Sequence, residues 1–142
     1  MKSESTPATT SLSELRTLVI INTLRSCQLF TGLPAADLRN IAAVAAIKTL
    51  AKDSYLFHER DAAQGFYVVQ SGAISVGRVN AAGKEQIIHV FRAGESFAEV
   101  ALASSQGYPA DARAQETSQV LLVEKQGILT LLKRQPELAL RM

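Results

Sequence analysis

A chain of 142 residues is long enough to form one domain with its own hydrophobic core. Its hydrophobic fraction of 47% and charged fraction of 20% are typical of a globular protein and exclude a disordered chain. A net charge of +2 is too small to create a nucleic-acid surface, and the single cysteine, Cys27, excludes a disulfide framework, a cysteine-ligated zinc site and a cysteine-ligated iron–sulfur cluster.

The N-terminal segment, residues 1–10, is polar and rich in serine and threonine, which predicts a flexible tail. It has no secretory signal, and the apolar stretch that follows it is interrupted by Glu14, Arg16 and Arg25. No run approaches the roughly 18 uncharged apolar residues that a membrane span needs. We therefore expect a cytoplasmic protein without a membrane partner.

Two helices are predicted next. Ser11 stands three residues before Glu14, which is the spacing of a capping box, and apolar residues continue at helical spacing to about Ser26. An apolar turn over residues 29–34 leads to a second helix, which we predict directly after Pro34. The apolar residues expected on one side of that helix are Leu38, Ile41, Ala42 and Ala45.

Short runs of β-branched and aromatic residues follow Lys48 and alternate with turns. We predict strands over residues 55–58, 66–70, 73–79, 86–91 and 120–123. Their spacing is typical of an antiparallel sandwich or barrel rather than of alternating strands and helices. After Glu124 the helical pattern returns, and Pro136 suits the first turn of a last helix. This order predicts a mainly β domain over residues 11–142, a β-roll with helices packed at its open end.

The segment over residues 93–102 carries the densest signal for a binding site. A turn at Gly94 and Glu95 leads through Phe97 into one or two helical turns that we predict to open near Glu99. The N–H groups at such an opening bind anions, and a neighbouring carboxylate suits a sugar hydroxyl. The alternative is an ordinary capped loop, in which the helix dipole favours Glu99. The residues alone leave both interpretations open.

The motif parts of this segment are Gly94-Glu95, Phe97-Ala98-Glu99 and Ala101-Leu102. They resemble the phosphate-binding cassette of cyclic-nucleotide-binding domains, and the resemblance extends over about residues 24–142. It is greatest to the effector domain of bacterial transcription regulators of the CRP/FNR superfamily, and the F-A-E form of the cassette also resembles the denitrification-regulator branch. The resemblance implies a double-stranded β-helix, or jelly roll, with flanking N- and C-terminal helices.

The sequence departs from this family where an arginine pairs with the cyclic phosphate and a serine or threonine adds a hydroxyl. Counting back twelve residues from Val120 places Tyr108 at the arginine position and Asp111 at the hydroxyl position. Tyrosine donates only one neutral hydrogen bond. A carboxylate about 4 Å from the phosphate would cost roughly 4 kcal/mol at an effective dielectric constant near 20. We therefore expect that cyclic AMP is not bound in the ordinary way.

The resemblance implies that a small-molecule effector of unknown identity binds at the cassette and at this loop. The ligand-binding residues it indicates are Gly94, Glu95, Phe97, Ala98, Glu99, Val100, Ala101, Tyr108, Pro109, Ala110 and Asp111. The denitrification-regulator branch would further imply haem, with His89 as the better of the two histidine ligand candidates. A hydrogen-bonded structural role is the alternative for His89, and His58 is expected at an exposed strand end.

Two classes of function remain in view. The first is a ligand-sensing, non-enzymatic regulatory domain whose effector biases the helix after Pro136. In the full-length protein that helix would form a homodimer and pass the change to a DNA-binding helix-turn-helix domain that these residues do not include. A true cyclic-nucleotide-binding module is one alternative. A small cupin-like metal enzyme is another, although such sites need two or three histidines with a carboxylate.

Two further expectations concern Cys27 and the first helix. Cys27 stands alone near a helix end, which indicates an inert buried thiol. Specific DNA binding by this chain alone is not expected, and any dimer it forms would use another surface, such as the first helix around Leu15, Val19 and Ile20.

Overall fold

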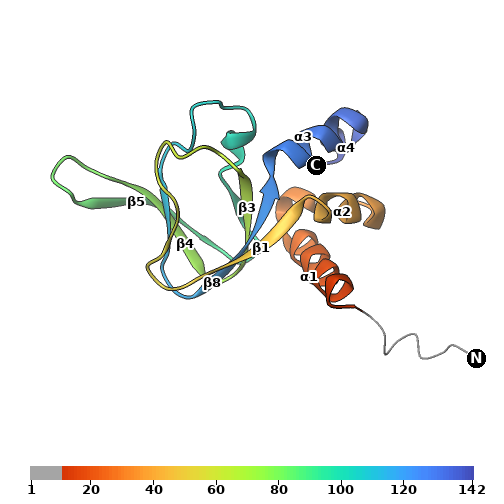
Figure 1. The fold of residues 1–142 in the computed structure, drawn as a ribbon, viewed down its shortest axis with the longest axis horizontal. Coiled ribbons are helices and arrows are strands. Elements are labelled where there is room, and N and C mark those ends of the chain that lie inside the picture. Colours follow the sequence, from red (N-terminus) through yellow and green to blue (C-terminus); the bar gives the residue numbers. More distant parts are fainter. Residues whose placement is uncertain (1–10) are drawn as a thin grey trace, which may run out of the picture.

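Two four-stranded antiparallel sheets form the centre of the computed structural model, which describes residues 11–142 (Figure 1). The predicted flexible tail, residues 1–10, lies outside the described residues. One sheet has the order β1-β8-β3-β6 and the other β2-β7-β4-β5. The strands are β1 (Ala45–Leu50), β2 (Tyr55–Phe57), β3 (Gly65–Ser71), β4 (Ala73–Val79), β5 (Glu85–Arg92), β6 (Ser96–Phe97), β7 (Asp111–Ala114) and β8 (Ser118–Glu124). The predicted mainly β jelly roll is confirmed.

Helices flank this roll at one end, and the β4–β5 hairpin projects at the opposite end (Figure 1). The helical elements are α1 (Leu12–Ser26), η2 (Gln28–Phe30), α2 (Ala35–Ala42), η3 (Glu99–Leu102), α3 (Lys125–Arg134) and α4 (Pro136–Arg141). The predicted capping box is present, because the Glu14 N–H donates to Ser11 Oγ at 3.1 Å and the Ser11 N–H donates to Glu14 Oε1 at 3.2 Å. Pro136 lies in the first turn of α4, as predicted.

The prediction that Ala45 belongs to the second helix is wrong. Helix α2 ends at Ala42, and Ala45 instead pairs with Val123 in the β1–β8 ladder. The pairing with β8 overrides the helix propensity of the alanines, because propensity is a weak preference that tertiary contacts replace. Strands β1, β6 and β7 were not predicted.

The two-residue period of β3 divides the hydrophobic core into two clusters. Phe66 and Val68 face the helices, where they pack in the helix-side cluster with Leu24 and Ile128. The alternate residues of β3 face the inside of the roll and pack in the roll-side cluster. Its buried members include Phe57, Tyr67, Val69, Ile74, Phe97 and Tyr108. Strand β8 divides in the same way, so the same two strands support both clusters.

One ion pair joins the C-terminal helix to the N-terminal part of the chain. The Arg141 guanidinium donates from Nε and Nη2 to the two Asp37 oxygens, each at 2.9 Å. The Asp37 side chain is only 7% exposed, whereas that of Arg141 is 38% exposed. Because both nitrogens reach one carboxylate, the pair holds α4 against α2 in a fixed orientation.

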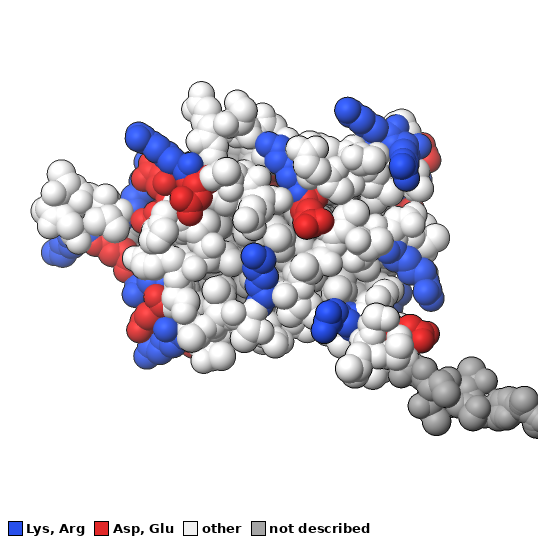
Figure 2. Space-filling model, viewed as in Figure 1, with Lys and Arg blue, Asp and Glu red and all other residues white. Residues whose placement is uncertain are grey.

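Exposed large apolar side chains gather on α1 and on the β4–β5 hairpin, and Tyr55, Val100 and Leu140 are exposed elsewhere. On α1, Leu15 and Val19 are exposed as expected for a contact surface, but Ile20 is buried in the helix-side cluster and was wrongly included. Figure 2 shows Lys and Arg side by side with Asp and Glu near the β4–β5 end, and more widely separated charged side chains at the centre of this face. Among residues 11–142, no helix combines the length and the apolar run needed to cross a membrane.

Candidate functional site

The cassette segment turns twice through left-handed backbone. Gly94 has φ +88°, and the turn it forms is held by Glu95, whose Oε1 accepts from the Arg92 N–H at 2.8 Å. The second left-handed residue is Ala98, at φ +66°, directly before η3. This conformation costs a residue with a Cβ atom roughly 1–2 kcal/mol, so Ala98 is strained. The predicted helical turn at Glu99 is present as η3.

A cavity of about 150 Å³ opens beside this segment. Six of the residues predicted to bind a ligand line it, and three residues from other strands complete it. The lining residues are Phe57, Val76, Phe91, Phe97, Ala98, Glu99, Val100, Pro109 and Ala110. Of the remaining predicted residues, Ala101 is fully buried in the roll-side cluster. The structure therefore assembles the cassette and the following loop around one small space.

Aromatic rings form much of the cavity wall. The Phe91 and Phe97 rings stack with centroids 5.1 Å apart and an interplanar angle of 22°, and the Phe57 ring lies 6.5 Å from that of Phe97. Glu99 is the one ionisable residue among those that line the cavity. Its Oε2 accepts a hydrogen bond from Ser96 Oγ at 2.5 Å. The cavity is consequently apolar at its walls and anionic at one edge.

Tyr108 does not face this cavity. Its ring stacks on Phe57 at a centroid distance of 3.7 Å, and its hydroxyl donates to the Gly65 carbonyl at 2.8 Å. The loop is held in this position because the Arg60 N–H donates to the Tyr108 carbonyl at 2.7 Å and the Tyr108 N–H donates to the Asp61 carbonyl at 3.1 Å. The Tyr108 hydroxyl therefore bonds inside the core and not into this cavity, and a role of Tyr108 in ligand binding stays a prediction.

Asp111 also lies away from the position expected for it. Along β7, Ala112 and Ala114 are buried inside the roll, whereas Asp111 and Arg113 point to the outer face. The Asp111 carboxylate accepts from the Glu59 N–H at 2.6 Å and lies 3.8 Å from His58 Nδ1. The predicted repulsion between Asp111 and a bound phosphate does not apply on this geometry. The A-D-A-R-A alternation of residues 110–114 was the signal that could have placed Asp111 outward.

The residues present do not fit haem. His89 is exposed and does not line the cavity, although its ring lies 4.3 Å from the Phe91 ring at the edge. The imidazole of His58 is 60% exposed and neighbours Asp111 on the outer face. A cavity of about 150 Å³ is of the size that holds one benzene ring, and a porphyrin is several times larger. Within residues 11–142, no three His, Cys, Asp or Glu side chains converge in a way that could hold a metal ion.

Gly94 and Glu95 line a different hollow, of about 190 Å³, on the side of the cassette that faces η2. Cys27 lies there, 1% exposed, and burial raises the pKa of its thiol above the ordinary value. A buried thiol with a raised pKa is largely protonated at neutral pH and reacts slowly. The predicted buried position of Cys27 is confirmed.

One residue near the cavity was not predicted to take part in binding. Arg78, on β4, shares the strand face of Val76, which lines the cavity, and its Nε donates to the carbonyl of Pro109 at 3.0 Å. Arg78 is therefore held beside Pro109, one of the residues that line the cavity. The sequence signal that could have indicated this is the two-residue spacing between Val76 and Arg78, which places both side chains on the same face of β4.

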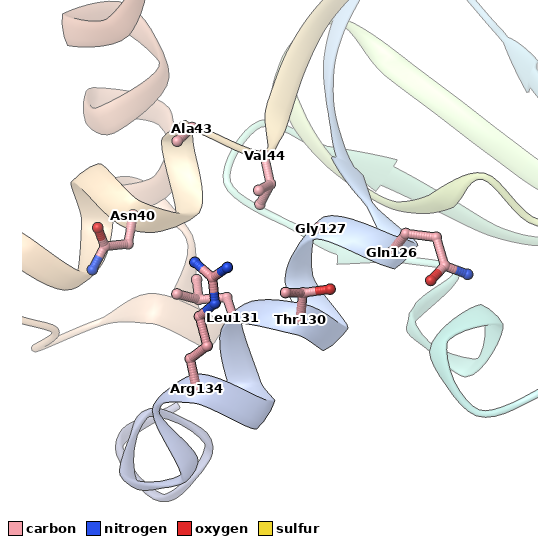
Figure 3. Close-up of a pocket in the computed structure, with 8 residues that line it drawn as sticks. All are labelled: Asn40, Ala43, Val44, Gln126, Gly127, Thr130, Leu131 and Arg134. Atoms are coloured by element: carbon pink, nitrogen blue, oxygen red, sulfur yellow. The ribbon is translucent and has the colours of Figure 1, made fainter.

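A larger groove of about 480 Å³ lies outside the roll, between α2 and α3 (Figure 3). Figure 3 shows Arg134 and Asn40 at one end of it and Gln126 at the other. At its floor, Gly127 passes so close to Val44 that an added Cβ atom would lie 2.5 Å from the valine Cβ. The groove contains none of the residues predicted to bind a ligand, so we place the candidate site in the cavity at the cassette.

Comparisons with known proteins identify the family to which the chain is similar. The model of the cyclic nucleotide-binding domain family matches residues 47–135. The cyclic AMP receptor protein of Thermus thermophilus is 30% identical over 84 residues, which are 59% of this chain and 39% of that relative. The matched part is therefore less than half the length of the relative.

Solved structures show the same fold. The sensor domain of the transcriptional regulator DNR from Pseudomonas aeruginosa has a TM-score of 0.77 and 29% identity, with 87% of this chain and 83% of that chain covered. The N-terminal domain of a transcriptional regulator from Streptomyces coelicolor has a TM-score of 0.72 and 25% identity, with 87% and 83% covered.

Proposed function

Since the chain belongs to the cyclic nucleotide-binding domain family, we propose that it is the ligand-sensing domain of a CRP/FNR-type regulator, with its effector bound in the cavity beside η3. Support comes from the family match, from relatives whose names describe a receptor and transcriptional regulators, and from the cavity formed by the cassette. The domain acts by binding rather than by catalysis. In a longer, dimeric regulator, a helix-turn-helix domain would then read the DNA.

The effector is not a cyclic nucleotide bound in the ordinary way of the family. The observation that carries this proposal is that Glu99 is the one ionisable residue lining the cavity, while Tyr108 is folded into the core. A cyclic phosphate placed beside Glu99 would lose its hydration without meeting a cation, because the nearby Arg78 is not among the residues that line the cavity. It would also lie beside a carboxylate, which disfavours the anion further.

A direct contact connects the site to the C-terminal helices. Lys125, the first residue of α3, donates from Nζ to the carbonyl of Ser104 at 2.9 Å, just after η3. A ligand that moves η3 therefore pulls on the start of α3. Helix α3 leads into α4, and Asp37 of α2 binds Arg141 of α4. A movement of α3 would therefore shift the position of α4 relative to α2.

Calorimetric titration of the purified chain with cyclic AMP and cyclic GMP tests this proposal. We expect no saturable binding at micromolar concentrations of either nucleotide. Mass spectrometry of small molecules that co-purify provides the positive arm, with Ala110→Leu as a matched variant that fills the cavity. A molecule bound to the wild type and missing from Ala110→Leu supports the proposal. Micromolar binding of cyclic AMP would contradict it.

A further inference from the structure

We propose that the cavity takes the ring of a small aromatic acid, whose acid group is bound by the guanidinium of Arg78 at the cavity mouth. The inference deepens the proposed function, on which it rests, by naming the chemical class of the effector. It is carried by two independent features, namely the size and chemistry of the cavity and the position of one arginine.

The cavity favours a single flat ring. A cavity of about 150 Å³ with apolar walls is large enough for a benzene-sized group. Phe91 and Phe97 present nearly parallel rings on one side, and such faces favour offset stacking with a third ring. Ala110 and Val76 add aliphatic surface. A purine, a ribose and a phosphate together are far larger than the ring this space accepts.

Arg78 supplies a cation at the open side of that space. Its Nε is fixed by the Pro109 carbonyl, and Pro109 itself lines the cavity. Two other arginines are paired with carboxylates: Arg113 pairs with Glu85 at 2.7 Å, and Arg141 pairs with Asp37. Arg78 differs from both. Among residues 11–142, no carboxylate lies within 4.0 Å of the Arg78 guanidinium, and its Nη atoms make no hydrogen bond.

Two planar N–H donors fixed in direction match a carboxylate or a phosphate monoester. Glu99, which lines the cavity, repels an acid group and accepts a hydrogen bond from a hydroxyl or amino substituent. The two charged residues therefore define one orientation of the ring, with the acid directed to Arg78 and any hydrogen-bond donor directed to Glu99.

The test measures the affinities of three ring probes by calorimetric titration. Benzoate and phenyl phosphate carry the two acid types, and benzyl alcohol carries a ring of the same size without charge. They are titrated into the wild type, Arg78→Gln and Arg92→Gln. Arg92 is the matched control, because it is an exposed arginine on the neighbouring strand of the same sheet. Equal melting temperatures of the three proteins show that folding is unchanged.

We expect at least one acid to bind the wild type and Arg92→Gln alike, and to bind Arg78→Gln at least tenfold more weakly. Benzyl alcohol should bind all three proteins equally and more weakly than the acid binds the wild type. Equal affinity for acid and alcohol, or equal loss in the two arginine variants, overturns the role of Arg78 and leaves the cavity as the site. If none of the three ring probes binds, the proposal that the cavity takes an aromatic ring is overturned. The proposed function is tested separately, by the titration with cyclic nucleotides.

Discussion

The hydrophobic clusters on the two sides of strands β3 and β8 differ in how completely their side chains are packed. On the helix side, Phe66 of β3 and Ile128 of α3 are fully buried in the helix-side cluster, and the Asp37–Arg141 pair holds α4 against α2. On the roll side, Phe97 is buried, but Phe91 of β5 is only half-buried and the cavity remains beside it. Neighbouring residues of one strand thus serve different purposes. The helix side is closed by packing, whereas the roll side leaves a cavity that is the proposed ligand site.

The largest effect is expected from removing an aromatic ring on the helix side. Phe66→Ala should lower the free energy of unfolding by about 3–5 kcal/mol, because it opens a void in a fully buried cluster. Phe91→Ala is the matched variant on the roll side. It should cost only roughly 1–2 kcal/mol, because that side chain is half-buried. Urea unfolding measures both.

Ligand binding should reverse this ranking. Phe91→Ala removes one wall of the cavity and should weaken binding of a ring probe more than any stability change accounts for. If Phe91→Ala destabilises the chain as much as Phe66→Ala, the roll side is an ordinary core and the contrast between the two sides is wrong.

A smaller loss is expected from the ion pair that closes the helix side. Asp37→Asn keeps the shape of the side chain but removes the charge that accepts two hydrogen bonds from Arg141. We expect the free energy of unfolding to fall by about 1.5 kcal/mol, the lower end for hydrogen bonds to charged groups, because Arg141 remains partly hydrated. Asp53→Asn is the control, since the Asp53 carboxylate that faces Arg113 is 64% exposed and such pairs contribute little. Equal losses in the two variants would show that burial of Asp37 is unimportant.

Much of the fold follows from the sequence, because its determinants are local. The capping box at Ser11 was predicted from its spacing, and β3 from its short run of β-branched and aromatic residues; both signals act over a few residues. Strands β1 and β7 were missed because they are rich in alanine, which has no strand preference of its own. They become strands by pairing with β8 and β4, which are distant in the sequence.

The site was predicted only in part, for a related reason. The cassette is continuous, so its motif placed Phe97 and Glu99 at the cavity without further information. The count from Val120 gave the residues of the following loop but not the directions of their side chains. Arg78 comes from another strand, and its approach to Pro109 depends on the pairing of β4 with β7. Such contacts between separate strands are set by tertiary packing and not by a local motif.

Tyr108 gives the smallest and most specific test, because it lies where the two sides meet. Its hydroxyl donates to the Gly65 carbonyl and accepts from the Gln64 N–H at 3.2 Å, so it joins the loop to the start of β3. Tyr108→Phe keeps the stacking on Phe57 and removes only these bonds. We expect a loss of about 1 kcal/mol in urea unfolding, the usual net value of a hydrogen bond in a folded protein. Binding of benzoate should be unchanged, since the hydroxyl points away from the cavity. If Tyr108→Phe weakened benzoate binding tenfold without lowering stability, the hydroxyl would belong to the ligand site. Tyr108 would then be a binding residue and not part of the stabilising core.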